Sequence, residues 1–205
     1  MFYEEKILTL KDETRISAYI RESNKEKWLI VTHGIGEHGL RHKHFFKHFS
    51  QYYNICLFDL RGHGNSDGAK AHIDDFRTFS YDLKEVIDQL HTHYKMNEYV
   101  LFGHSMGGLI VADFMQNDVE KGFYPEKVFL SSPAVSPTGF LGQLLYSLKS
   151  NWLKTIADKT INLKLGGVLD INKLSHNDAI AHDYANDPKN ILKPSAKLLL
   201  QTVSR

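Results

Sequence analysis

The chain is poor in three features, each of which would point to a different class of protein: cysteine, net charge and long apolar runs. Its single cysteine, Cys56, excludes an internal framework of disulfide bonds, and we expect it to fill the core. The formal net charge of +1 lacks the basic excess of a nucleic-acid-binding protein, so we expect no nucleic acid among the partners. No apolar run approaches the ~20 residues of a membrane span, and the charged N-terminus has no signal-peptide core. These absences predict a cytoplasmic protein.

What the sequence does contain is an alternation of apolar runs and helical patterns. Its 205 residues, 42% of them hydrophobic, suffice for one domain with a sizeable core. Alternating polar and apolar residues predict an antiparallel hairpin over 2–23. Continuous apolar runs predict strands buried on both faces at 27–34, 54–60, 98–105 and 126–133. Helical periodicity predicts helices between them at 42–53, 74–94 and 106–118. This order predicts an α/β fold, with a mainly parallel sheet covered by helices on both faces.

The pattern changes after residue 133, where no further buried-strand run follows. We therefore expect residues 1–133 to form the core, 134–190 a helical cap over the edge of the sheet, and 191–205 the start of a helix that returns to the core. An apolar stripe over 140–156 fits two interpretations, an acyl-binding tunnel or the packing of the cap on the core. The same cap is a candidate surface for peripheral contact with a membrane.

The stretch "LFGHSMGG" over 101–108 carries the clearest chemical signal. Ser105 stands between Gly103 and Gly107, after a predicted strand and at the start of a predicted helix, which is the context of a nucleophile elbow. A tight strand-to-helix turn brings backbone close to backbone and leaves no room for side chains at the two glycines. The N-terminus of the helix then directs free N–H groups toward charge that develops beside the serine.

An oxyanion hole needs two such donors. The first is expected to be the backbone N–H of Met106, the residue after the nucleophile. The second is expected from the glycine-rich loop "THGIGEHG" over 32–39, where Ile35 is placed to supply its N–H.

These motifs occur together and in a familiar order. "HGIGEHGLRH", "FDLRGHGNSDG", "GHSMGG" and "LSSPA" resemble the monoacylglycerol lipase and lysophospholipase group of α/β-hydrolases, whose bacterial members are often labelled serine-aminopeptidase-like hydrolases. The resemblance runs from about residue 5 to the end of the chain. It implies the α/β-hydrolase fold, a mainly parallel sheet with helices on both faces and a helical cap. It also implies that Ser105 is the nucleophile and that Ile35 and Met106 are the oxyanion donors.

The resemblance further implies roles for two polar residues of the "HGIGEHGLRH" stretch. Glu37 and Arg41 match the family's positions beside the alcohol end of the substrate pocket. Alternatively, the two side chains brace the loop through a Glu–Arg pair.

We expect neither a metal nor a cofactor. His44 and His48 lie one helical turn apart, but zinc needs three or four convergent ligands, so a solvated helix face is favoured. His33 and His63 are expected to hold their loops by hydrogen bonds. His104 adjoins the nucleophile, but its side chain is expected to point away from the serine hydroxyl.

The catalytic base and acid are the missing parts of this site. The family order is serine, acid, histidine, and after Ser105 the sequence holds only His176 and His182, both in the predicted return from the cap. The aspartates of this region have no strand before them; they are Asp170, Asp178, Asp183 and Asp187. Two more strands with their helices would need roughly 70–100 residues. We therefore expect a truncated copy, a processed fragment or one piece of a two-chain enzyme.

The sequence thus supports an enzyme hypothesis and an alternative. The leading hypothesis is a serine hydrolase of carboxylic esters, acting on monoacylglycerols or lysophospholipids through an acyl-enzyme. The alternative is a catalytically silent fragment that serves as an interaction module, and a peptidase or C–C bond hydrolase remains open within the enzyme class. The strand at 126–132 should have a bare edge, which predicts pairing with a complementary C-terminal chain or with a second copy.

Overall fold

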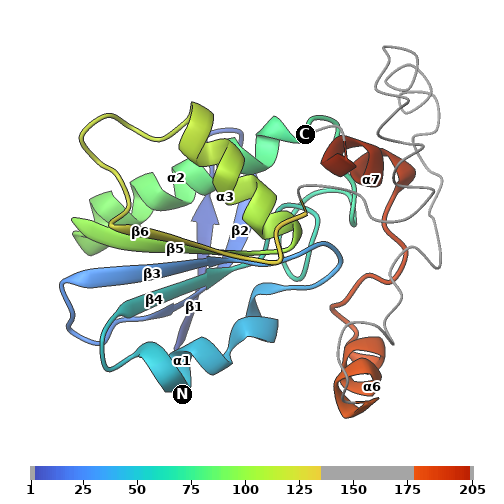
Figure 1. Cartoon of the computed structure of the whole chain (residues 1–205), viewed down its shortest axis with the longest axis horizontal. Helices are drawn as coiled ribbons and strands as arrows, with labels where there is room; N and C mark the ends of the chain where they lie inside the picture. Colours follow the sequence, from blue (N-terminus) through green and yellow to red (C-terminus); the bar gives the residue numbers. More distant parts are fainter. Residues whose placement is uncertain (1–2, 135–177, 204–205) are drawn as a thin grey trace.

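The computed structural model describes residues 3–134 and 178–203. Its centre is a six-stranded sheet in the order β1-β2-β4-β3-β5-β6 (Figure 1). The strands are β1 (Glu4–Thr9), β2 (Arg15–Arg21), β3 (Lys27–Thr32), β4 (Asn54–Phe58), β5 (Glu98–His104) and β6 (Lys127–Ser131). β1 and β2 form the predicted antiparallel hairpin, and β2 also runs antiparallel to β4. β4, β3, β5 and β6 run parallel, which confirms the predicted parallel sheet.

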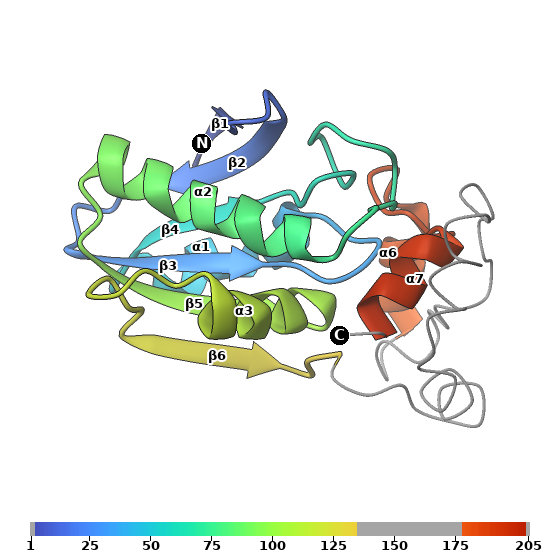
Figure 2. The ribbon, with the colours of Figure 1, turned by 90° about the horizontal axis from the view of Figure 1, so that it is seen from above.

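The helices lie on both faces of this sheet. α2 and α3 cover one face and α1 covers the other (Figures 1 and 2). The described helices are η1 (Gly39–His42), α1 (His44–Phe49), α2 (Arg77–Tyr94), α3 (Met106–Asn117), α6 (Asp178–Asn186) and α7 (Ala196–Val203). α1 is shorter than the helix predicted at 42–53, because a separate 3₁₀ turn precedes it and the chain turns after Phe49, whose carbonyl accepts the N–H groups of Tyr52 and Tyr53.

The alternation of side chains along β3 explains why a continuous apolar run was needed there. Trp28 and Ile30 belong to the core cluster under α2 and α3, while Leu29 and Val31 belong to the cluster under α1. A strand covered on both faces has no polar side, and each fully buried large apolar side chain contributes about 1.5–3 kcal/mol.

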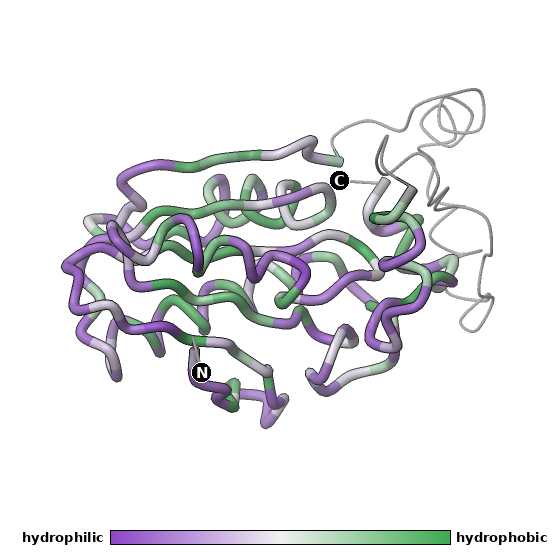
Figure 3. The backbone as a smooth tube through the Cα atoms, turned by 90° about the horizontal axis from the view of Figure 1, so that it is seen from below, coloured by the Kyte–Doolittle hydropathy of each residue, from purple (hydrophilic) through white to green (hydrophobic). Residues whose placement is uncertain are grey.

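β6 departs from the prediction of a strand buried on both faces. Its side chains Val128, Phe129 and Leu130 are 36%, 52% and 43% exposed. Among the described residues, β6 pairs only with β5 and ends the sheet, so no strand lies along its outer edge and these residues stay partly exposed. Figure 3 shows β6 as a hydrophobic stretch at the rim of the described chain. The predicted strand is confirmed and, within the described part of the chain, it forms the end of the sheet, but its predicted burial on both faces was wrong.

The predicted division into core, cap and return stays a prediction. The apolar stripe at 140–156 falls within 135–177, outside the described residues. Of the later segments, α7 contributes Leu198, which is fully buried in the main core cluster. None of the described helices has the length and apolarity that crossing a bilayer would require.

Candidate active site

Ser105 occupies a sharp turn between β5 and α3. Its backbone angles are φ 51° and ψ −119°, in a region that residues other than glycine rarely adopt. A Cβ on Gly103 would lie 2.5 Å from the carbonyl oxygen of Gly107, and one on Gly107 would lie 2.2 Å from that of Thr32. The space therefore admits only glycine at both positions, as the motif predicted.

The elbow is also tied to the end of β6. The N–H of Ser105 donates to the carbonyl of Ser131 at 2.9 Å, and the N–H of Ala134 donates to the carbonyl of Ser105 at 3.1 Å. These bonds hold the strained residue in place from both sides. Because α3 begins at Met106, the Met106 N–H belongs to the first turn of the helix and has no intrahelical acceptor.

The loop after β3, residues 33–39, lies directly against this elbow; we call it the β3 loop. A Cβ added at Gly34 would lie 3.1 Å from the Cβ of Ser105. Ile35 follows Gly34, and its side chain is half-buried against the main core. The fold thus brings the two predicted donor segments, one at Ile35 and one at Met106, to the same serine.

His33 fixes the peptide that carries the Ile35 N–H. Its Nε2 accepts the N–H of Leu60 at 2.9 Å, so its Nδ1 carries the proton and donates to the carbonyl of Gly34 at 2.8 Å. That carbonyl and the Ile35 N–H belong to one planar trans peptide, so fixing the first directs the second. Burial, followed by the nearby His63, holds the pKa of His33 well below its usual value. His33 is therefore neutral and occupied at both nitrogens.

Glu37 braces the same loop from inside. Its Oε1 accepts the N–H of Gly34 at 2.6 Å and lies 3.2 Å from Nε2 of His42. Burial raises the pKa of Glu37, but the contacts with His42, His33 and the Gly34 N–H outweigh it and lower the pKa to about 2. The predicted alternative of a Glu–Arg pair was wrong, because Glu37 pairs with His42 and Arg41 pairs with Asp183.

Arg41 contacts the last turns of α6, and His38 contacts the residue that follows this helix. The guanidinium of Arg41 pairs with the carboxylate of Asp183 and lies 5.3 Å from the ring centre of Tyr184. Nε2 of the buried His38 lies 2.9 Å from Oδ2 of Asp187. Sequence reasoning weighed these aspartates only as catalytic acids and missed this role, because nothing local indicates a partner about 145 residues away.

Asp59 is a further functional candidate that sequence reasoning missed. Its fully buried carboxylate accepts the Gly39 N–H at 2.8 Å, the Asn65 N–H at 2.8 Å and the Tyr19 hydroxyl at 2.9 Å. It joins the β3 loop to the loop after β4. The available signal was a carboxylate at the end of a buried strand, directly before a glycine-rich loop.

No residue that the structure describes serves as a base beside the nucleophile. Across residues 3–134 and 178–203, no side chain hydrogen-bonds to the Ser105 hydroxyl. His182 lies on the exposed side of α6 with its Nε2 near Asn186, and His176 lies outside the described residues. The ring of His104 lies near His42, at 5.8 Å between ring centres. Within the described part of the chain, no group of histidine, cysteine or carboxylate side chains could hold a metal ion.

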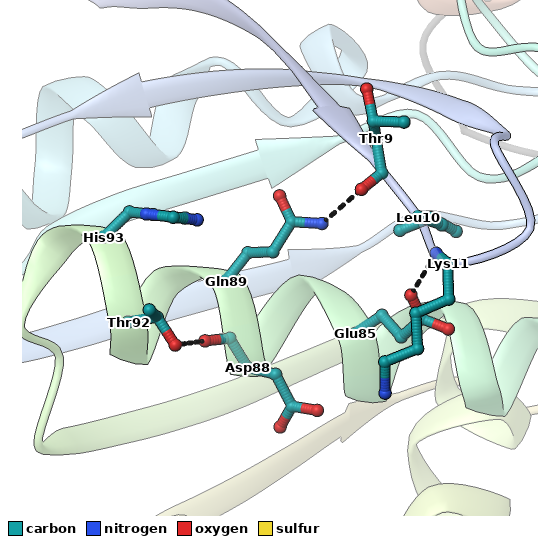
Figure 4. A pocket seen from close by; sticks show the side chains of 8 residues that line it. All are labelled: Thr9, Leu10, Lys11, Glu85, Asp88, Gln89, Thr92 and His93. Atoms are coloured by element: carbon teal, nitrogen blue, oxygen red, sulfur yellow. Dashed lines mark hydrogen bonds between the residues drawn. The ribbon is translucent and has the colours of Figure 1, made fainter.

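Hollows elsewhere on the surface are separate from this site. One of about 460 Å³ lies between the β1–β2 turn and α2, where Gln89 donates to the carbonyl of Thr9 and the Lys11 N–H donates to Glu85 (Figure 4). Its lining includes neither the elbow nor the β3 loop. The hollow is open to solvent and lies apart from Ser105.

Comparison with known proteins places these motifs in a family. Residues 23–205 match the family model described as serine aminopeptidase, S33. The monoglyceride lipase of Mus musculus is 31% identical over 180 residues, which are 83% of this chain and 54% of that protein. The phospholipase YtpA of Bacillus subtilis is 27% identical over 179 residues, 85% of this chain and 66% of that protein. The chain thus spans about half the length of the monoglyceride lipases it matches.

Solved structures agree with this placement. The monoacylglycerol lipase of Paleococcus ferrophilus superposes with a TM-score of 0.68 at 26% identity, over 93% of this chain and 68% of that one. A monoglyceride lipase from Saccharomyces cerevisiae gives a TM-score of 0.75 over 98% of this chain and 66% of that one, and at 18% identity it speaks for the fold alone. The chain belongs to the serine aminopeptidase S33 family and has the α/β-hydrolase fold.

Proposed function

We propose that this chain carries the nucleophile and the oxyanion hole of a serine hydrolase of carboxylic esters. The observation that carries the proposal is the contact between two independent segments. Ser105 has a strained backbone conformation directly before α3, and Gly34 of the β3 loop packs closely against it. A serine presented in this way, with backbone donors on either side, suits the tetrahedral intermediate of acyl transfer.

In the reaction, Ser105 Oγ attacks the ester carbonyl carbon and its proton passes to a general base. The carbonyl oxygen becomes an oxyanion that the N–H groups of Ile35 and Met106 stabilise. Collapse of the intermediate breaks the ester bond, the base returns its proton to the leaving alcohol, and a water then hydrolyses the acyl-enzyme by the same steps. No cofactor enters this sequence.

We assign the base and its carboxylate to the part of such a protein that lies outside these 205 residues. Support comes from the lack of a side chain bonded to the Ser105 hydroxyl among the described residues, and from the half-length match to the monoglyceride lipases. Alone, the chain should then keep only the weak catalysis of its oxyanion hole, because losing the triad histidine costs on the order of 10⁶-fold.

We propose monoacylglycerols or lysophospholipids as the substrates. Relatives carrying those names support this choice, among them the monoglyceride lipase of Mus musculus and a probable lysophospholipase of Haemophilus influenzae, 31% identical over 55% of this chain. Glu37 and Arg41 belong near the alcohol end of the substrate. Since both side chains already have partners, they serve there by holding the loop.

Covalent labelling tests the nucleophile. A fluorophosphonate probe should add to Ser105 of the protein at its native length, and Ser105→Ala should abolish the adduct. A chain-length series of p-nitrophenyl esters then tests the lipid assignment. Faster turnover of acetate than of long acyl chains would count against a lipase.

A catalytically silent interaction module is the second candidate. It is favoured by the unpartnered hydroxyl of Ser105 among the described residues. The same probe separates the two, because labelling requires an activated hydroxyl and a silent module would stay unmodified.

A further inference from the structure

We propose that Asp187 is a positioning residue for the oxyanion hole, acting on the β3 loop through His38. The inference rests on the proposed function and deepens it, since it names what holds the second donor segment in place. The segment that follows α6 would then be a working part of the site rather than a passive connection.

The β3 loop is held on two sides by different parts of the chain. On one side the contacts come from the loop's own side chains and from the residue after β4: Glu37 holds the Gly34 N–H, His33 holds the Gly34 carbonyl, and Asp59 holds the Gly39 N–H. These contacts fix both ends of the loop. Within the described part of the chain, none of these three side chains bonds Gly36, in the middle of the loop.

The middle of the loop is held by the segment 183–191. The N–H of Ile191 donates to the carbonyl of Gly36 at 2.7 Å. Gly36 follows Ile35 and has a φ of 72°, in the left-handed region, where glycine has several conformations open to it. The bond from Ile191 selects one of these conformations next to the expected donor.

Asp187 supplies the side-chain half of this support. Its Oδ2 lies 2.9 Å from Nε2 of His38, and its Oδ1 accepts the N–H of Lys189 at 2.9 Å, which shapes the turn that leads to Ile191. The His38 side chain is only 5% exposed and that of Asp187 is 23% exposed. Water therefore competes weakly for this contact.

Asp183 offers an internal comparison. Its carboxylate pairs with Arg41, but its side chain is 72% exposed, so water and salt screen the pair. Both aspartates link the segment 183–191 to the stretch 38–41. Because Asp187 is the more buried of the two, we expect it to contribute most to holding the β3 loop in place.

The first test is hydrogen exchange, read amide by amide in the full chain. Asp187→Ala should speed exchange of the loop amides over 34–39 about tenfold or more. Asp187→Asn keeps an oxygen for the Lys189 N–H and removes the charge that faces His38, so it should give an intermediate rise. Asp183→Ala should change these amides less than about threefold. Asp88→Ala, which removes the half-exposed Lys84–Asp88 pair on α2, is the matched control and should leave them unchanged.

The second test is the rate at which a fluorophosphonate labels Ser105 of the native-length protein. Asp187→Ala should lower that rate about tenfold, and Asp187→Glu should recover part of it. If the segment merely docks on the core, its own amides at 187–191 will exchange faster while 34–39 and the labelling rate stay at wild-type values; that result overturns the proposal. Failure to label the wild type defeats the proposed function, and the exchange of 34–39 still decides the role of Asp187.

Discussion

At the scale of single residues, two buried side chains decide how the backbone beside Ser105 is presented. His33 holds the carbonyl of Gly34 and Glu37 holds its N–H, so both polar groups of one glycine are fixed. Neither side chain is expected to touch substrate. His33 acts through the peptide that carries the Ile35 N–H, and Glu37 acts through the preceding peptide, which carries the Gly34 N–H.

Removing the His33 contacts should impair the oxyanion hole. His33→Phe keeps a planar ring but leaves the Gly34 carbonyl and the Leu60 N–H without their partners. Losing one oxyanion donor costs roughly 10²–10³-fold in rate, and a misdirected donor should approach the lower figure. The measurement is the labelling rate of Ser105 by a fluorophosphonate, with the exposed His48→Phe as control. An unchanged rate in a folded His33→Phe variant would contradict this role.

Glu37 gives the site a defined pH dependence of stability. Its pKa falls from an ordinary 4.5 in the unfolded chain to about 2 in the folded chain. The folded state therefore binds the proton less readily, so the stabilisation is complete above pH 4.5 and is lost as the pH falls toward 2. Its size is on the order of 3 kcal/mol. In urea unfolding, Glu37→Gln should be less stable than wild type at pH 6, and the difference should shrink toward pH 2. A difference independent of pH would exclude the carboxylate charge as its source.

Residues constrained by their neighbours in sequence were predictable, and residues constrained from afar were not. Ser105 and its two glycines follow from a steric rule that operates within five positions. The contacts of Asp59 and Asp187 depend on where loops meet in the fold, and no periodicity encodes that. Closeness in sequence is not sufficient either, because Glu37 pairs with His42, five positions away, and not with Arg41.

At the scale of elements, the elbow depends on how closely α3 approaches β3. Gly107 is the point of contact, since a Cβ there would meet the Thr32 carbonyl oxygen at 2.2 Å and the His33 carbonyl oxygen at 2.5 Å. Backbone atoms on both sides leave no flexible side chain that could move aside. The start of α3 is therefore set by the absence of a side chain.

Gly107→Ala should push α3 away from β3 and destabilise the chain by about 3 kcal/mol or more. Gly122→Ala is the control for conformational strain alone, because Gly122 has a φ of 91° and nothing within 4 Å of an added Cβ. It should cost about 1 kcal/mol. Denaturant unfolding compares the two, and equal losses would show that the close approach does not limit α3.

The elements themselves were largely predictable, because each central strand is a short apolar run and each long helix has a clear apolar face. The burial of these elements was less predictable. An apolar run such as that of β6 has the same sequence pattern whether the strand lies in the centre of a sheet or at its edge. Only the strand order distinguishes the two positions. Helix lengths failed where a turn intervened, as at η1 before α1.

At the scale of the whole molecule, the two edges of the sheet differ in kind. β1 carries Glu4, Glu5 and Lys6, and charges of this sort discourage pairing with another strand. β6 instead exposes Val128, Phe129 and Leu130 on both of its faces. A bare apolar edge of this kind favours association through β6.

The 205-residue chain should therefore self-associate, and charge on β6 should reduce it. Phe129→Lys combined with Leu130→Glu places a charge on each face of the edge. Sedimentation velocity should show a shift from larger species toward monomer. Ile7→Lys, at the exposed position of β1, is the matched control and should change nothing. A wild-type chain that sediments as a monomer at all concentrations would contradict the expected pairing.

The central claim is that Ser105 is an activated nucleophile in the protein at its native length. Intact-mass analysis after treatment with a fluorophosphonate tests it most directly, with Ser105→Ala treated in parallel. We predict one adduct per chain, mapped to Ser105 and absent from the variant. A native-length protein that stays unmodified under conditions that label another serine hydrolase, or that carries its adduct elsewhere, would contradict the claim.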